Sequence, residues 1–245
     1  MRRGTVIDDA RELICPIFSV RAEGNGIYLE SRVFLGTAFF VSRCGDAITA
    51  AHVLPPPDQL RESHRLVAVV VREGREEACW VTHAATFDAW DLALLHVNLS
   101  ATKYLPVLVT EVLAGSDVQF LGIADHEVWG AGKEMRMLKG HVTMAVAPWV
   151  ELSCSVPPGM SGSPLFVADR LIGCVVGTFR TEQIEDSTVE TREIRGQKEI
   201  VRVTEVRRTF QYGKAFCFAS AGATPLPVLD NKTLVAFLHG RNEEP

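Results

Sequence analysis

Short stretches of apolar, or alternating apolar and polar, residues recur along most of the chain. They are rich in β-branched and aromatic side chains, and turn residues separate them. Many short strands at this spacing are typical of an all-β sandwich or of β-barrels, rather than of alternating strands and helices. We expect strands at 33–41, 65–71, 78–82, 92–97, 117–123, 134–145, 149–154, 165–167, 171–179 and 214–219.

Residues 181–212 differ from the rest because they carry many charges. The alternation continues on both sides of residues 195–197, a turn at the centre of this segment, which predicts a long exposed hairpin. A solvated ribbon is the simplest interpretation of so many charges. The alternative is an arm that covers a substrate or contacts a protein partner.

The end of the chain shows a helical pattern. Asp230 or Asn231 can cap the first turn, and apolar residues follow at helical spacing up to Leu238. Gly240 then ends the pattern. We therefore expect a short C-terminal helix at about residues 230–239, packed on the rest of the fold.

Composition excludes several function classes. The chain has 245 residues, 47% hydrophobic and 22% charged, as in an ordinary globular protein. Its formal charge of −5 argues against nucleic-acid binding. No apolar run approaches the roughly 20 residues that cross a bilayer, and the acidic residues after Arg2 and Arg3 argue against a signal peptide. We therefore expect a cytoplasmic protein without a membrane partner.

The cysteines predict neither a metal site nor a cofactor, because none has C-x-x-C or similar spacing. Without an export signal, free and mostly buried thiols are expected in place of disulfides. The six are Cys15, Cys44, Cys79, Cys154, Cys174 and Cys217.

Three residues each stand in a setting that suits a catalytic group. His52 follows a strand that ends in small residues, which leave room for a neighbouring loop beside the ring. Asp91 leads into an apolar strand, where a carboxylate can accept a hydrogen bond from a histidine; Asp88 competes for this role but lies before the strand. Ser161 stands in a glycine-flanked turn, residues 159–162, that can hold a hydroxyl outward. Each residue alone also fits an ordinary turn or packing role.

The order of His52, Asp91 and Ser161 along the chain is that of the chymotrypsin arrangement. With this order, the chain resembles the trypsin/chymotrypsin-like serine peptidases, and is most similar to the bacterial branch with the HtrA peptidase domain and the V8-type enzymes. The stretches that carry the resemblance are 36–41 with 49–52, 91–95 and 159–166.

This resemblance implies an all-β, chymotrypsin-like fold of two six-stranded antiparallel β-barrels, with the active site between them. The first barrel, residues 1–105, would carry His52 and Asp91. The second, residues 106–245, would carry Ser161, the charged hairpin and the C-terminal helix.

The resemblance also implies a role for each site residue. Ser161 would attack the scissile carbonyl of a protein or peptide substrate, His52 would move the proton, and Asp91 would orient His52. The main-chain N–H groups of Gly159 and Ser161 would form the oxyanion hole. Ser163, the second serine of the motif, is assigned to the turn.

Three departures from the family pattern bear on regulation. Met160 stands where the digestive enzymes have an aspartate that pairs with a newly freed N-terminus, so activation by N-terminal processing is not expected. Val53 follows His52 where a disulfide usually clamps the histidine loop. Only about 25 residues follow residue 220, so no PDZ-like domain is expected.

Substrate preference follows from the residues that the family alignment brings to the S1 pocket. None is acidic, which argues against Arg or Lys at P1, and Val175 replaces the histidine of glutamate-specific members. We expect a small or medium apolar P1 residue. The S1 residues are Ser155, Val176, Gly177, Thr178 and Ala215.

Three functions remain open on sequence alone. The first is an active serine endopeptidase. The second is a catalytically silent binding protein on a peptidase fold. The third is a latent peptidase whose activity depends on a regulatory protein that engages hairpin 181–212.

Overall fold

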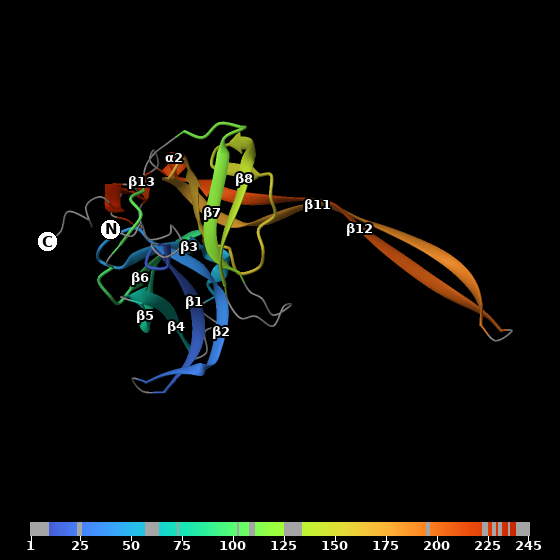
Figure 1. Cartoon of the computed structure of the whole chain (residues 1–245), viewed down its shortest axis with the longest axis horizontal. Helices are drawn as coiled ribbons and strands as arrows, with labels where there is room; N and C mark the ends of the chain where they lie inside the picture. Colours follow the sequence, from blue (N-terminus) through green and yellow to red (C-terminus); the bar gives the residue numbers. More distant parts are fainter. Residues whose placement is uncertain are drawn as a thin grey trace.

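The computed structural model describes a chain that consists mostly of β-strands (Figure 1). The strands form two closed barrels of six strands each, and a two-stranded sheet lies near the C-terminus. This confirms the all-β, chymotrypsin-like fold expected from the sequence. The structure describes residues 10–23, 26–56, 64–72, 74–101, 103–107, 111–124, 134–194, 197–221, 225–226, 229, 232–234 and 236–238.

The first barrel has the strand order β1-β2-β3-β6-β5-β4, with all neighbours antiparallel. Alternate apolar residues of these strands point inward, and Phe40 and Leu95 are fully buried there. β2 and β3 pair at only two positions, Phe39 with Ile48 and Phe40 with Ala47. The strands are β1 (Ile14–Glu23), β2 (Gly26–Phe40), β3 (Asp46–Ala50), β4 (His64–Arg72), β5 (Arg75–Phe87) and β6 (Leu92–Val97).

The second barrel repeats the architecture in the order β10-β11-β12-β9-β8-β7. Its core contains Phe120, Leu152 and Leu165, which are all fully buried. The strands are β7 (Asp117–Ala124), β8 (Glu134–Val146), β9 (Trp149–Leu152), β10 (Pro164–Val167), β11 (Arg170–Ile194) and β12 (Gln197–Cys217).

A long hairpin extends from the second barrel. β11 and β12 pair from Gly173 with Cys217 to Ile194 with Gln197, and their outer part projects far beyond both barrels (Figure 1). The hairpin predicted at 181–212 is therefore confirmed. Its strands are longer than expected, because β11 and β12 run without a break through residues 171–179 and 214–217. The strand predicted at 214–219 is wrong at residues 218–219, which belong to the helix α2 (Phe218–Ala221).

The C-terminal helix begins later than the sequence suggested. Residues 232–233 form β14 (Lys232–Thr233), which pairs with β13 (Pro225–Leu226). The Thr233 hydroxyl accepts a hydrogen bond from Ala236 N–H at 3.1 Å, so Thr233 caps a helical segment that includes residues 234 and 236–238. Asp230 and Asn231, the expected caps, lie outside the described residues. A second helix, α2 (Phe218–Ala221), was not predicted.

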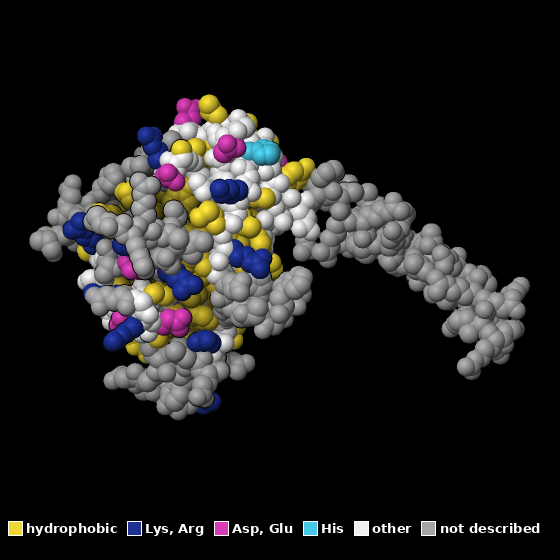
Figure 2. All heavy atoms as spheres, in the orientation of Figure 1, with side chains coloured by type: hydrophobic (Ala, Val, Ile, Leu, Met, Phe, Trp, Pro, Cys, Tyr) yellow, Lys and Arg dark blue, Asp and Glu magenta, His cyan; other side chains and the backbone are white. Residues whose placement is uncertain are grey.

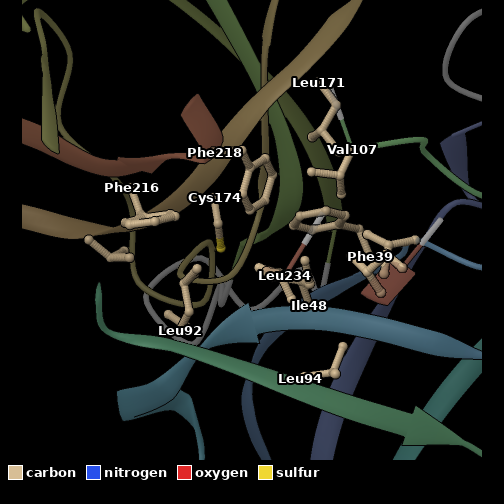
Figure 3. Close-up of a cluster of buried hydrophobic side chains, with 14 of the residues drawn as sticks. Phe39, Ile48, Leu92, Leu94, Val107, Leu171, Cys174, Phe216, Phe218 and Leu234 are labelled. Carbon is tan, nitrogen blue, oxygen red and sulfur yellow. The ribbon is translucent and has the colours of Figure 1, made fainter. Parts of the chain in front are cut away.

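A shared hydrophobic core joins the two barrels (Figure 3). Phe39, Ile48 and Leu92 come from the first barrel. Phe216 comes from the second barrel and Phe218 from α2, which follows it; all five are almost fully buried. Burying large side chains from both barrels in one cluster fixes how the barrels sit against each other. Groups on facing loops of the two barrels can therefore be held at hydrogen-bond distance.

Side chains of different kinds are mixed on one face of the molecule. On the face shown in Figure 2, acidic and basic side chains of the described residues are interspersed, and apolar side chains reach the surface between them. Scattered apolar residues are normal on a protein surface.

Candidate active site

His52 and Asp91 meet because the strands beside them are paired. β3 and β6 run antiparallel, with Ala50 opposite Leu92. The chain leaves β3 through the single-turn helix η1 (Ala51–Val53) and enters β6 from the single-turn helix η2 (Asp88–Trp90). The ladder continues one step further, where Ala51 N–H donates to Asp91 O at 2.8 Å.

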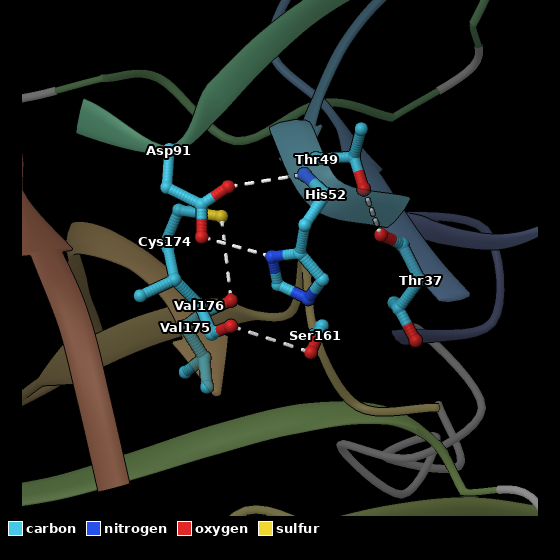
Figure 4. A network of polar contacts seen from close by, with 8 residues as sticks. All are labelled: Thr37, Thr49, His52, Asp91, Ser161, Cys174, Val175 and Val176. Carbon is cyan, nitrogen blue, oxygen red and sulfur yellow. Dashed lines mark hydrogen bonds and ion pairs between the residues drawn. The ribbon is translucent and has the colours of Figure 1, made fainter. Parts of the chain in front are cut away.

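The Asp91 carboxylate holds His52 through two contacts (Figure 4). Oδ1 accepts the main-chain N–H of His52 at 3.0 Å, and Oδ2 lies 2.8 Å from Nδ1 of the ring. The first contact fixes the carboxylate and the second fixes the orientation of the imidazole. The side chains are 48% and 33% exposed, so the pair is open to a ligand. Asp88 is exposed, and its carbonyl accepts the Asp91 N–H at 3.2 Å.

A tight backbone conformation places Asp91. Its φ of 49° and ψ of 42° lie in the left-handed region, which aspartate tolerates better than most residues. Trp90 just before it stacks on Phe216 of the second barrel, with ring centroids 5.1 Å apart. Cys174 lies behind the carboxylate (Figure 4). Burial raises the pKa of the Cys174 thiol well above its ordinary value, and the charge of Asp91 adds to the effect.

Ser161 lies in the turn between β9 and β10. Gly159 and Gly162 on either side both have a φ of 87°, a conformation that glycine adopts without strain. In Figure 4 the Ser161 side chain lies on the opposite side of the imidazole from Asp91. Its Oγ–H donates a long hydrogen bond of 3.4 Å to the carbonyl of Val176.

The two neighbours of Ser161 that were singled out in the sequence are both buried. Met160 is 0% exposed and belongs to the core of the second barrel. Ser163 is also 0% exposed, and its Oγ has no hydrogen-bond partner among the described residues. A buried hydroxyl cannot meet a substrate, so Ser161 is the accessible serine of this turn.

Two main-chain N–H groups of the Ser161 turn donate no hydrogen bond to the described residues. The N–H groups of Gly159 and Ser161 have no acceptor within the described part of the chain, whereas those of Met160, Gly162 and Ser163 each donate to a carbonyl. N–H groups without an acceptor, next to a partly exposed hydroxyl, are what an oxyanion requires.

The residues expected to form the S1 pocket are spread over different environments. An ideal Cβ on Gly177 would lie 4.0 Å from Ser161 Oγ, so this part of β11 passes beside the hydroxyl. Thr178 Oγ1 accepts from Val156 N–H at 2.8 Å and donates to Val156 O at 3.0 Å, which ties β11 to the segment after the exposed Ser155. The side chains of Val176 and Ala215 are buried.

A groove of about 370 Å³ lies between the β8–β9 hairpin and the base of β11 and β12, and Trp149 and Phe179 line it. Lys214, the cross-strand partner of Gly177, lines it, with Nζ 3.5 Å from the Trp149 ring centroid. Burial lowers the pKa of Lys214, and the negative charge of Asp91 opposes that change. Sequence reasoning missed Lys214 because nothing in its local pattern marks it.

The six cysteines are thiols that form no disulfide, and Cys44 and Cys154 are only partly buried. No group of three or more His, Cys, Asp or Glu side chains among the described residues could hold a metal ion. Within the same part of the chain, no helix has the length and apolarity needed to span a membrane.

Comparison with known proteins assigns the family. Residues 36–177 match the family model described as a trypsin-like peptidase domain, and the chain belongs to this family. This match places the chain among the trypsin-like peptidases, whose members are hydrolases. No curated protein matches the sequence.

Three solved structures share the fold at low sequence identity. The HtrA-type protease AlgW with decapeptide has 15% identity and a TM-score of 0.52, over 86% of this chain and 62% of that chain. Deg5 has 16% identity and a TM-score of 0.52, over 70% of this chain and 82% of that one. The Rv3671c protease from M. tuberculosis, in its active form, has 19% identity and a TM-score of 0.52, over 71% and 73%. This chain thus spans less than two thirds of the AlgW chain.

Proposed function

We propose that the protein hydrolyses peptide bonds through an acyl-enzyme on Ser161, with His52 as general base and acid and Asp91 as its orienting partner. One observation carries the proposal. The imidazole of His52 is held by Asp91 at 2.8 Å on one side, and Ser161 lies on its other side (Figure 4). This is the arrangement that acyl transfer by a serine nucleophile needs.

The reaction would proceed in two halves. The Ser161 hydroxyl turns from Val176 O to Nε2 of His52, which takes the proton as Oγ bonds to the substrate carbonyl carbon. The tetrahedral oxyanion accepts hydrogen bonds from the N–H groups of Gly159 and Ser161. The intermediate collapses, His52 gives the proton to the departing amine, and an ester on Ser161 remains. Water then attacks the ester carbonyl and gives a proton to His52. As the bond to Ser161 breaks, His52 returns this proton to Oγ, and the acid is released.

The substrate is a protein or peptide with a small or medium apolar P1 residue. The absence of an acidic side chain among Ser155, Val176, Gly177, Thr178 and Ala215 supports this preference. A peptide library that varies only P1 tests it: we expect cleavage after Ala, Val or Leu. Strong selection for Arg, Lys or Glu would overturn this preference without affecting the triad.

No N-terminal processing step is needed for activity. Met160 is apolar and fully buried, so it cannot pair with an ammonium group. The hydrophobic core of the second barrel holds its side chain instead.

We also propose that the protein lies in a bacterial cytoplasm. Its six cysteines form no disulfide, which supports a reducing compartment. We further propose that the first barrel comprises residues 1–105 and the second barrel residues 106–245.

The second candidate is a latent peptidase that a regulatory protein activates through hairpin 181–212. The projection of β11 and β12 beyond the barrels favours this candidate. A two-stranded ribbon alone is marginally stable in water, so a protein that binds the ribbon would stabilise it. A binding protein without activity is the limiting case of this candidate.

A fluorophosphonate probe tests the proposed function. The purified chain should be labelled, and the label should be lost in Ser161→Ala but kept in Ser163→Ala, whose hydroxyl is buried. Labelling that persists in Ser161→Ala would contradict the assigned nucleophile. Labelling only after a cell extract is added would favour the latent form.

A further inference from the structure

Thr37 makes four hydrogen bonds at the boundary between the barrels. It is fully buried near the end of β2, at the point where β2 and β3 no longer pair. Its main-chain N–H donates to Ser161 O at 2.9 Å, and its hydroxyl donates to Gly159 O at 2.9 Å. Sequence reasoning placed Thr37 in a family stretch and gave it no role, because both acceptors are more than one hundred positions away; the hydroxyl bond spans 122.

The hydroxyl of Thr37 has no freedom to turn elsewhere. Ile123 N–H in β7 donates to Oγ1 at 2.9 Å. A hydroxyl has one proton, so with this acceptor position occupied the proton is directed to Gly159. The second barrel thus fixes the Thr37 side chain, and Thr37 in turn fixes the turn that carries Ser161.

The other side of Thr37 leads towards His52. Thr49 Oγ1 donates to Thr37 O at 2.6 Å, and Thr49 lies in β3 just before the turn with His52. Gly162 lies in the same gap, since an ideal Cβ on it would collide with Thr37 O and with Thr49 Oγ1. The Ser161 turn is therefore inserted between the separating strands β2 and β3, and Thr37 touches it on both sides of Met160.

Gly159 is the point at which this turn could most easily change shape. It has a φ of 87° and no side chain, so rotation about its backbone bonds meets little steric resistance. Such a rotation would redirect its N–H. The hydrogen bond from Thr37 to Gly159 O opposes it.

We propose that Thr37 is a positioning residue that keeps the Gly159 and Ser161 N–H groups directed at the substrate oxygen. The proposal rests on the proposed function, in which these two groups form the oxyanion hole. It explains how the hole is kept in shape although Met160 cannot pair with a new N-terminus. A neighbouring strand of the first barrel provides the restraint, and it is present as soon as the chain is folded.

Thr37→Val tests the proposal, since valine has nearly the shape of threonine but no hydroxyl. We expect kcat to fall by about 10- to 100-fold with KM changed by less than about threefold, somewhat below the loss of a direct oxyanion donor. A peptide aldehyde forms a tetrahedral adduct whose oxygen lies where the oxyanion develops. Its inhibition constant should rise by the same factor as kcat falls.

Thr37→Ser restores the hydroxyl and should recover both constants to within about threefold. Ser42→Ala is the matched control. Ser42 is also fully buried in the first barrel, and its hydroxyl makes two hydrogen bonds with Asp46, at 2.7 and 3.1 Å, without touching the Ser161 turn. The Ser42→Ala variant should be less stable than the parent chain, but its kcat and the inhibition constant of the peptide aldehyde should not change.

Two results would overturn the proposal. One is a folded Thr37→Val protein whose kcat and aldehyde constant both stay within about twofold of the parent. The other is a Thr37→Ser protein as impaired as Thr37→Val, which would reduce Thr37 to a packing residue. If Thr37→Val does not fold, Thr37→Ala against Thr37→Ser isolates the hydroxyl, and equal kcat values in that pair would reject the proposal. Failure of the proposed function gives a different result. Either the parent chain has no activity, or the Ser161→Ala variant is as active as the parent chain.

Discussion

The carboxylate of Asp91 contacts His52 at two atoms, 3.0 Å from the main-chain nitrogen and 2.8 Å from Nδ1 of the ring. The first contact is independent of the ring, so it holds the carboxylate in place while the imidazole gains and loses a proton. One residue thus fixes both the turn that carries His52 and the direction of its side chain.

Replacing this carboxylate by an amide tests its role. In Asp91→Asn the main-chain hydrogen bond can persist, but the amide NH₂ can donate to Nδ1 and so favour the tautomer with a proton on Nε2. That tautomer cannot accept the Ser161 proton. We expect kcat to fall by about 10⁴ with little change in KM. Steady-state kinetics on an optimised peptide measure this.

Asp88→Asn is the control for this substitution. Asp88 is exposed and its backbone carbonyl, not its side chain, accepts the Asp91 N–H. Its kcat should stay within about twofold of the parent. A drop of less than tenfold in Asp91→Asn would contradict the orienting role, because the wrong tautomer removes the base.

The two serines of the turn should respond in opposite ways. Ser161→Ala should lower kcat by about 10⁶, which leaves only binding and oxyanion catalysis. Ser163→Ala should leave kcat within a few-fold and should not lower the free energy of unfolding, because it removes a buried hydroxyl that has no partner within the described residues. Steady-state kinetics and urea unfolding of both variants measure these differences. Equal loss of kcat in both variants would mean that Ser161 only shapes the turn.

Buried thiols should make the protein less stable at alkaline pH. Burial raises the pKa of the Cys15 and Cys174 thiols far above the ordinary range. The unfolded chain can ionise these thiols near pH 8.5 and the folded one cannot, so the contribution is complete below that pH and is lost as pH rises. The free energy of unfolding should fall by up to about 1.4 kcal/mol per pH unit and thiol.

Urea unfolding at pH 7, 9 and 10 measures this dependence. In Cys174→Ala the slope above pH 9 should be shallower than in the parent chain. A disulfide reagent should react with the partly exposed Cys44 in the folded protein but not with Cys15 or Cys174. Identical slopes in the two proteins would show that Cys174 ionises in the folded state.

The sequence was sufficient for features with a local signal. Period-2 alternation predicted most strands, since one side of each strand faces a barrel core. The settings of His52, Asp91 and Ser161 are also local, so they could be found one by one. The N-terminal strand β1 (Ile14–Glu23) was missed, although an apolar run at 14–18 and alternating residues at 19–23 mark it in the sequence.

Contacts between distant segments could not be predicted. The hydrogen bond from the Thr37 hydroxyl to Gly159 O joins one barrel to the other. The sequence around neither residue has a pattern that predicts this bond. The helix start was wrong for a similar reason. Pairing of β14 with β13 satisfies the backbone of residues 232–233, so Thr233 becomes the cap in place of the expected Asp230 or Asn231.

The hairpin offers a test of substrate recognition that leaves the site intact. Deleting residues 184–208 and closing the ribbon with a glycine-containing turn removes the paired outer part of β11 and β12 but keeps Gly177 with Lys214. If the arm recognises proteins, cleavage of a folded substrate should drop about tenfold or more while a short peptide is cleaved as before. Unchanged cleavage of both substrates would contradict a recognition role.

Gly162 and Gly115 form a matched pair for testing how tightly the Ser161 turn is held. Both have a φ of 87°, but a Cβ on Gly115 would meet nothing within 4 Å, whereas one on Gly162 would collide with Thr37 O and Thr49 Oγ1. The two alanine variants therefore share the backbone strain, about 1–2 kcal/mol for a left-handed alanine. Only Gly162→Ala must also push the turn out of the gap between β2 and β3.

We expect Gly115→Ala to lower the free energy of unfolding by this strain alone and to keep kcat within about twofold. Gly162→Ala should be less stable still and should lose at least about 100-fold in kcat, because a shift near 1 Å misplaces both Ser161 and its N–H donors. Urea unfolding and peptide kinetics on both variants measure the difference. A folded Gly162→Ala protein with near-parental kcat would show that the turn does not need its position against Thr37 for catalysis.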